Sequence, residues 1–228
     1  MSDPFRTVFA IYPGLTQLDF TGPFEILARL PRAEAIVASR DGGAIRSDTG
    51  LEIGATRRLA DIDACDLICV PGGPGVEAAS LDPEFLAELK RLATGARYIT
   101  SVCNGSLILG AAGLLKGKRA ACHWAWRDLL PLFGATPVAE RVVRDGNVIT
   151  GGGVTAGIDF ALTVMADIAG ERIARAIQLA VEYAPAPPFD SGTPEAAGAE
   201  VADLIVSRSA GRKESFAKAH QAGRVLTM

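Results

Sequence analysis

The sequence predicts an α/β fold with a mostly parallel central sheet that helices cover on both faces. Short β-rich runs alternate along the chain with segments of helical spacing, as they do where crossover helices join parallel strands. The chain has 228 residues, 49% of them hydrophobic, which is enough to bury one well-packed core without disulfide or metal support.

The first half of the chain contains most of the expected strands. A β-rich run at 6–12 closes at Pro13-Gly14, and an apolar run at 67–70 ends in Pro71-Gly72-Gly73-Pro74-Gly75. The other runs that predict strands lie at 35–39 and 97–102, with a hairpin over 46–53. The segments with helical spacing lie at 18–30, 83–93 and 104–112.

The second half is expected to be mainly helical. A helix over 124–133 is strained or ended by Pro131, and a hairpin over 141–150 turns at Asp145-Gly146. The remaining segments with helical spacing lie at 155–169, 171–183 and 196–207. Between the last two, APAPPFDSGTP at 184–194 is too rich in proline for regular structure and predicts an arm or linker. We therefore expect a catalytic domain over 1–194 and a helical tail over 195–228, part of the same domain or partly ordered.

Charge and cysteine usage point to a small-molecule protein of the cytoplasm. The net charge is -3 with no block of Lys and Arg, so nothing suggests a nucleic-acid partner. Neither a secretory signal nor a run of about 18 apolar residues is visible, so no membrane partner is expected. Cys65 and Cys69 would lie about 13 Å apart on one strand, too far for a disulfide. Free thiols are therefore expected.

Cys103 is the first candidate for chemistry. In RYITSVCNGSLILGAAG, a β-rich strand runs directly into Cys103 and an apolar helix starts at once, with small residues that permit a tight turn. This pattern is typical of a nucleophile elbow, and the positive helix N-terminus would favour the thiolate. A buried structural cysteine fits the pattern equally well. The other three cysteines lack such a turn and are assigned that structural role.

Three further features are candidates for the same site. The backbone N–H groups of Gly73 and Asn104 are predicted to stabilise developing negative charge, although an ordinary glycine-rich turn is the alternative. Asp19 is a candidate proton carrier, or simply an acid in a first helical turn. His123 is a candidate partner of Cys103, or a half-buried histidine at a helix start, and we leave it outside the catalytic set. No CxxC or HxxxH spacing indicates a metal site.

Together these features resemble the DJ-1/PfpI superfamily, and most of all its isonitrile hydratases. The resemblance is carried by Asp19, the Pro71-Gly72-Gly73 turn and Val102-Cys103-Asn104-Gly105. Longer motifs such as PGLTQLDFTGP, HWAWRDLL and VVRDGNVITGGGVTAGIDF extend it from about residue 12 to residue 194. It implies a flavodoxin-like three-layer sandwich, a homodimer, a Cys103 nucleophile with Asp19 as its acid, and no cofactor. One departure is Asn104, where these hydratases carry threonine.

The function that this resemblance implies is hydration of an isonitrile to an N-substituted formamide, with the isonitrile and water as partners. An apolar cavity is expected for a neutral substrate. Trp124 and Trp126 are candidates to line it, although aromatic residues on a helix more often belong to the core. A glyoxalase-like or deglycase-like activity on 2-oxoaldehydes and a redox sensor that oxidises Cys103 remain alternatives. HWAW and GGGVTAGIDFAL also resemble sensor domains of helix-turn-helix regulators, but the tail is too short for that complete module.

Overall fold

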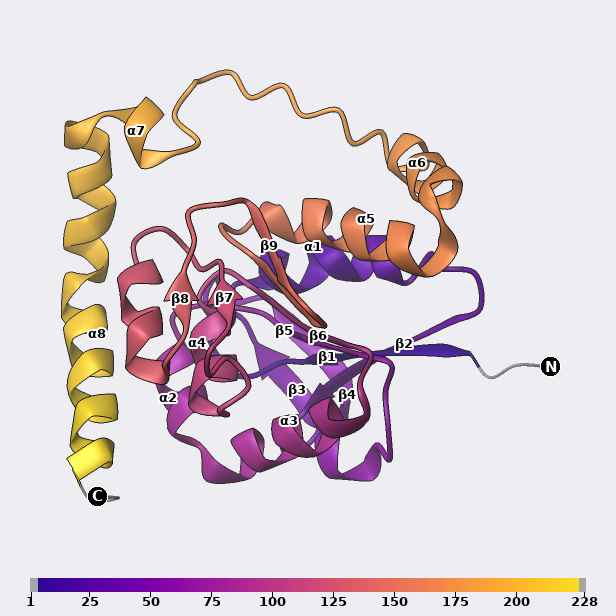
Figure 1. Ribbon diagram of the computed structural model, residues 1–228, viewed down its shortest axis with the longest axis horizontal. Coiled ribbons are helices and arrows are strands. Elements are labelled where there is room, and N and C mark those ends of the chain that lie inside the picture. The colour runs from indigo at the N-terminus through magenta and orange to yellow at the C-terminus, as the bar shows by residue number, and fades with distance from the viewer. Residues whose placement is uncertain (1–3, 226–228) are drawn as a thin grey trace.

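An eight-stranded sheet runs through the molecule in the order β3-β4-β2-β1-β5-β6-β10-β9. The computed structural model describes residues 4–225 (Figure 1). All pairs from β4 to β10 are parallel, and antiparallel pairing is confined to the two edges, β3 with β4 and β9 with β10. The strands are β1 (Phe5–Ala10), β2 (Ala33–Ser39), β3 (Gly43–Arg46), β4 (Glu52–Arg58), β5 (Leu67–Val70), β6 (Tyr98–Val102), β9 (Val142–Asp145) and β10 (Val148–Gly151). The predicted fold class is confirmed.

Helices cover both faces of this sheet. On one face α1 packs against α5, which packs against α6, and on the other face α2, α3 and α4 contact one another (Figure 1). Their bounds are α1 (Gln17–Leu27), α2 (Val76–Leu81), α3 (Pro83–Gly95), α4 (Gly105–Ala111), α5 (Ala156–Ala169) and α6 (Glu171–Ala180). Two-residue strands β7 (Arg119–Ala120) and β8 (Thr136–Pro137) form a separate parallel pair. A short 3-10 helix, η1 (Leu59–Asp61), precedes β5.

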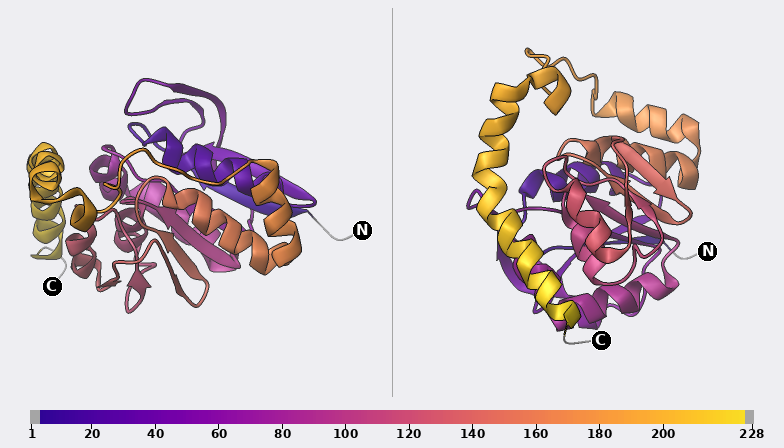
Figure 2. Two further views of the ribbon diagram at one scale, coloured as in Figure 1. Left: turned by 90° about the horizontal axis from the view of Figure 1, so that it is seen from above. Right: turned by 60° about the vertical axis from the view of Figure 1, so that its left-hand side comes forward.

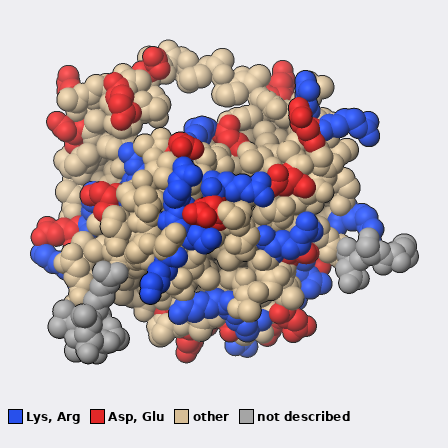
Figure 3. Space-filling model, in the orientation of Figure 1, with Lys and Arg blue, Asp and Glu red and all other residues tan. Residues whose placement is uncertain are grey.

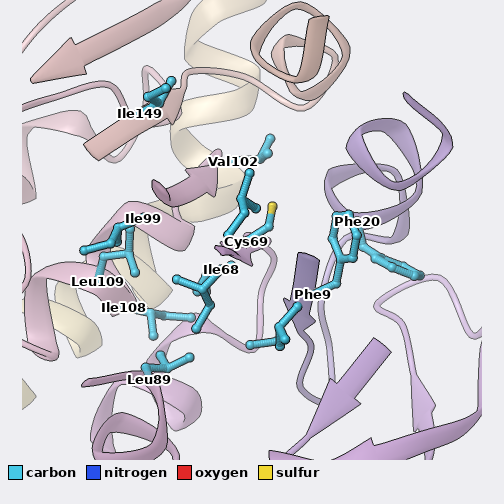
Figure 4. Close-up of a cluster of buried hydrophobic side chains, with 14 of the residues drawn as sticks. Phe9, Phe20, Ile68, Cys69, Leu89, Ile99, Val102, Ile108, Leu109 and Ile149 are labelled. Carbon is cyan, nitrogen blue, oxygen red and sulfur yellow. The ribbon is translucent and has the colours of Figure 1, made fainter. Parts of the chain in front are cut away.

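The core lies between the central strands and the helices on either side. Every residue of β5 and of β6 is buried, because central parallel strands are covered on both faces. Figure 4 shows Ile68 and Cys69 of β5 among side chains of neighbouring elements, including Phe9, Leu89 and Ile108. These central strands are the rigid elements that carry the candidate site at their carboxyl ends.

The segment predicted as a helix over 124–133 forms a 3-10 helix, η2 (Arg127–Phe133), rather than an α-helix. Pro131 lies inside it and lacks the N–H that an α-helix needs, and Gly134 closes it with a left-handed backbone at φ 71°. The predicted helix is thus present, but it begins at Arg127 rather than at residue 124.

The C-terminal segment forms a much longer helix than the predicted 196–207. After the short α7 (Pro194–Ala197), α8 (Ala199–Val225) runs along one side of the molecule (Figures 1 and 2). Its second half is docked: Phe216 is fully buried beside Trp126, and His220 Nε2 hydrogen-bonds Ser80 Oγ at 2.9 Å. The polar composition beyond residue 207 concealed these buried contacts, and the predicted extent was therefore wrong.

The predicted arm at 184–194 has no helix or strand before α7 begins at Pro194. In the space-filling view an open gap separates part of the arm from the rest of the molecule below it (Figure 3). Phe189, within this arm, is 75% exposed. The arm therefore connects α6 to α7 and α8 with little burial of its own.

Candidate active site

A sharp turn between β6 and α4 carries Cys103. Its backbone is in the left-handed region at φ 59°, which is strained for a residue with a side chain, and its N–H donates to the carbonyl of Gly151 at 3.1 Å. Two residues on, a Cβ on Gly105 would lie 2.4 Å from the Val70 carbonyl oxygen, so only glycine fits there. The strand-to-helix turn expected from the sequence is therefore present.

Asp19 of α1 lies fully buried against this turn. Its Oδ2 accepts a hydrogen bond from the Gly72 N–H at 3.0 Å, while its Oδ1 has no hydrogen-bond partner among the described residues. Burial raises the pKa of Asp19 to about 7, although the adjacent Cys103 thiol and the Gly72 N–H lower it. A buried carboxyl group that takes up and releases a proton near neutral pH is suited to proton transfer.

The thiol of Cys103 does not favour its ionised form in this setting. Burial raises its pKa well above the ordinary value, the neighbouring Asp19 raises it further, and only the Asn104 N–H lowers it. The Asn104 N–H at the start of α4 favours the thiolate, as the sequence predicts, but burial has the larger effect and favours the thiol. Cys103 therefore lies as a thiol beside Asp19.

Asn104 connects the elbow to the turn after β5. The Gly73 N–H donates to Asn104 Oδ1 at 2.7 Å, and Asn104 Nδ2 donates to the Gly73 carbonyl at 3.3 Å. The predicted donor at Gly73 is thus already occupied, whereas the Asn104 N–H lowers the pKa of the adjacent Cys103 thiol. Of the two predicted N–H donors, only that of Asn104 acts on Cys103.

The two glycines of this turn leave no room for side chains. A Cβ on Gly72 would lie 2.3 Å from Asn104 Oδ1 and 2.8 Å from Asp19 Oδ2. A Cβ on Gly73, whose φ is +143°, would lie 2.4 Å from the Thr16 nitrogen. The glycine-rich sequence therefore lets the backbone approach Asp19 and Asn104 at hydrogen-bonding distance.

A cavity of about 210 Å³ opens onto Cys103. Its apolar wall includes Trp126, but Trp124 is not among its lining residues. The cavity is less apolar than expected, because α8 adds polar and charged side chains that the sequence did not associate with the site. Its lining residues are Thr16, Asp48, Gly73, Pro74, Cys103, Asn104, His123, Ala125, Trp126, Val154, Ile205, Arg208, Ser209 and Arg212.

His123 also lines this cavity, but no hydrogen bond joins it to Cys103 within residues 4–225. Its ring stacks on Trp124 with centroids 5.7 Å apart, and Nδ1 accepts from the Ala125 N–H at 3.3 Å. Burial lowers the pKa of this imidazole, so it is neutral at physiological pH. His123 therefore contributes a neutral side chain to the wall of the cavity.

Tyr12 is a buried residue that sequence reasoning missed. Its hydroxyl donates to the Pro71 carbonyl at 3.0 Å, which ties the end of β1 to the turn after β5. Burial raises the pKa of this phenol, and Asp19 and Cys103 raise it further. Nothing in the sequence pattern distinguished it from an ordinary aromatic residue at a strand end.

The described residues hold no group of three His, Cys, Asp or Glu side chains arranged to bind a metal ion. Cys65, Cys69, Cys103 and Cys122 are all free and buried, and burial raises the pKa of each thiol. No helix among the described residues is both long and apolar enough to span a bilayer.

Comparison with known proteins places the site in context. The family model of the DJ-1/PfpI family matches residues 6–167. An isonitrile hydratase of Pseudomonas putida is 52% identical over 202 residues, which are 89% of each chain. A solved THiJ/PfpI family protein of Pseudomonas syringae has a TM-score of 0.92 and 41% identity, covering 96% of this chain and 91% of its own. The HTH-type transcriptional regulator CdhR of Pseudomonas aeruginosa is 29% identical over 73% of this chain and 51% of its own.

Proposed function

This chain belongs to the DJ-1/PfpI family, and on that premise we propose that it is an isonitrile hydratase that uses Cys103 as nucleophile and Asp19 as proton carrier. The observation that carries the proposal is the 52% identity, over 89% of both chains, to the isonitrile hydratase of Pseudomonas putida. Cys103, which lines the cavity, and Asp19, which is buried beside it, support the proposal, because hydration of an isonitrile requires a nucleophile and a group that moves protons.

The first step adds the thiol of Cys103 across the terminal carbon of R–N≡C. The sulfur forms a bond to carbon while Asp19 takes up the thiol proton and returns it to the same carbon, which gives the thioimidate Cys103–S–CH=N–R. A carboxyl group with a pKa of about 7 can do both at neutral pH. The Asn104 N–H, which lowers the pKa of this thiol, stabilises the negative charge of the sulfur as it ionises.

The second step consumes one water molecule. Asp19 accepts a proton from water as its oxygen attacks the thioimidate carbon, and the nitrogen takes up a proton. The resulting Cys103–S–CH(OH)–NH–R collapses to the formamide R–NH–CHO and the free thiol. The sum is R–N≡C plus H₂O giving R–NH–CHO, and the enzyme returns to its starting protonation state.

The direct test is formamide production from cyclohexyl isonitrile, followed by chromatography. Turnover by the parent protein and its loss in Cys103→Ala are expected. Cys65→Ala is the matched control, because it removes another buried free thiol whose sulfur contacts the Leu92 carbonyl rather than the cavity. Absence of formamide with several R groups, or full activity of Cys103→Ala, contradicts the proposal, and methylglyoxal then becomes the substrate to test.

We also propose that the protein is a homodimer in the cytoplasm. Large apolar side chains are exposed on α6, the arm and the first half of α8, and a partner subunit would cover them. These residues are Leu179, Phe189, Val201, Leu204, Ile205 and Val206. Four free cysteines suit a reducing compartment. Light scattering after size-exclusion chromatography is expected to give twice the chain mass of 23.8 kDa, and a monomer mass contradicts the dimer.

Residues 195–228 are proposed to belong to the same domain as residues 1–194. Phe216 is fully buried against Trp126 and Phe133, and Lys213 pairs with Asp128 at 2.7 Å. A single cooperative unfolding transition, seen equally by tryptophan fluorescence and by circular dichroism, is the expected result. Separate transitions for the two probes would contradict it.

A further inference from the structure

We infer that the substrate is a short isonitrile whose R group ends in a carboxylate, and that Arg208 and Arg212 of α8 bind this carboxylate. The inference rests on the proposed function, since it names the substrate class of the same cavity. It follows from the charge on one wall of the cavity, from the size of the cavity and from the shape of an isonitrile.

Arg208 and Arg212 both line the cavity that contains Cys103. They lie four residues apart on α8 and so project from the same face of the helix. Among the described residues neither guanidinium has an ion-pair partner, whereas the neighbouring Lys213 is paired with Asp128. Two unpaired guanidinium groups side by side match the geometry of a carboxylate, which accepts paired N–H donors.

The charge of the cavity wall stays positive when its other polar groups are counted. Asp48 is the acid that lines the cavity with the two arginines, and its Oδ2 accepts a hydrogen bond from Thr16 Oγ1 at 3.0 Å. No ion pair between Asp48 and either arginine occurs within residues 4–225. His123 adds no charge, because burial lowers its pKa. A neutral substrate would leave this charge unused.

The shape of the substrate directs its R group away from Cys103. The C≡N–R unit of an isonitrile is linear, so when the terminal carbon meets the sulfur, R projects to the other side of the nitrogen. Cys103 lies at the β6–α4 turn in the body of the molecule, and α8 forms an outer wall (Figure 1). The cavity volume of about 210 Å³ equals the volume that about seven molecules occupy in liquid water, which suits a short R group.

The test compares 3-isocyanopropanoate with its neutral methyl ester. We expect kcat/KM to be about tenfold higher for the acid than for the ester. The acid should have the lower KM and the two compounds a similar kcat, because an ion pair far from the reacting carbon is equally strong in the ground and transition states. The advantage should shrink as salt is added, since both arginines are solvent-exposed.

The double variant Arg208→Gln, Arg212→Gln is expected to bring the ratio of acid to ester close to one. The double variant with glutamate at both positions is expected to reverse the preference, which a merely structural role of these side chains would not do. Arg172→Gln on α6 is the matched control, because it removes an exposed arginine outside the cavity and should keep the parent ratio.

The outcomes separate this inference from the proposed function. If cyclohexyl isonitrile yields its formamide but neither of these two compounds does, the carboxylate inference is overturned. If none of the three compounds yields a formamide, the hydratase proposal itself fails. If the ester is hydrated as well as the acid by the parent protein, or if the arginine variants lower both rates equally, the carboxylate inference is overturned while the hydratase proposal stands.

Discussion

Replacing Asp19 by asparagine should stabilise the protein at alkaline pH and leave its stability at acid pH nearly unchanged. The carboxyl group is fully buried, and its pKa is raised from 3.8 to about 7 by that burial. The folded state therefore binds more protons than the unfolded state between these two pH values. The contribution of Asp19 to stability is therefore largest below 3.8, falls as pH rises through this window, and is lost above about 7.

The size of the effect follows from the same pair of values. Between 3.8 and about 7, at 1.36 kcal/mol for each pH unit, the loss amounts to about 4 kcal/mol. Asparagine cannot ionise, and its side-chain oxygen can still accept the Gly72 N–H, which donates to Asp19 Oδ2 at 3.0 Å. The variant should therefore gain about 4 kcal/mol over the parent at pH 8 and almost nothing near pH 4.

Urea denaturation at a series of pH values from 4 to 8 measures this difference directly. Asp190→Asn, which removes an exposed acid from the arm, is the matched control and should leave the pH dependence of the parent intact. The reasoning is refuted if the stability gain of Asp19→Asn is the same at pH 5 and pH 8, or if the parent protein becomes more stable as pH rises through 7.

Three further outcomes follow from the site. The kcat/KM for a neutral isonitrile should rise with pH through an apparent pKa near 7, because Asp19 must be ionised to accept the thiol proton; a flat profile from pH 5 to 8 would contradict this. Gly72→Ala should lower kcat by about 100-fold, because the added Cβ would lie 2.3 Å from Asn104 Oδ1. Its control is Gly54→Ala, whose added Cβ would meet nothing within 4 Å. Equal activities of the two variants would refute the reasoning. Phe216→Ala removes a fully buried side chain of α8, at a cost of about 3–5 kcal/mol in packing energy. It should raise KM and speed amide hydrogen exchange across α8. The control is Phe189→Ala, at an exposed position, and an equal KM for the two variants would contradict the role of α8 as a cavity wall.

The elbow could be predicted because its causes are local. The strand ends directly before Cys103, and Gly105 two residues later permits the tight turn into the helix. All of these residues are adjacent in the sequence, so the pattern alone predicts the turn. Asp19 was identifiable as a candidate, but its raised pKa depends on burial by elements distant in the chain. At Cys103, too, burial by distant elements has a larger effect on the pKa than the local helix N-terminus.

The wall formed by α8 could not be predicted, because its contacts join residues more than 100 positions apart. Ser80 meets His220, and Cys103 shares a cavity with Arg208, yet neither pair lies within one motif. The occupied N–H of Gly73 was missed for a similar reason: glycine spacing suggests a free backbone donor, and only the position of the Asn104 side chain shows that it is already bonded.

The exposed arm is the connection that tethers α8, one wall of the cavity, to the rest of the protein. About ten residues without regular structure hold α8 close to the body, which corresponds to an effective concentration on the order of millimolar. A protease cut within 184–193 would turn this docking into a bimolecular association. The released helix would then leave whenever the protein is more dilute than the dissociation constant for that association. The cut protein would keep Cys103 while losing Arg208 and Arg212, to which we assign substrate selection.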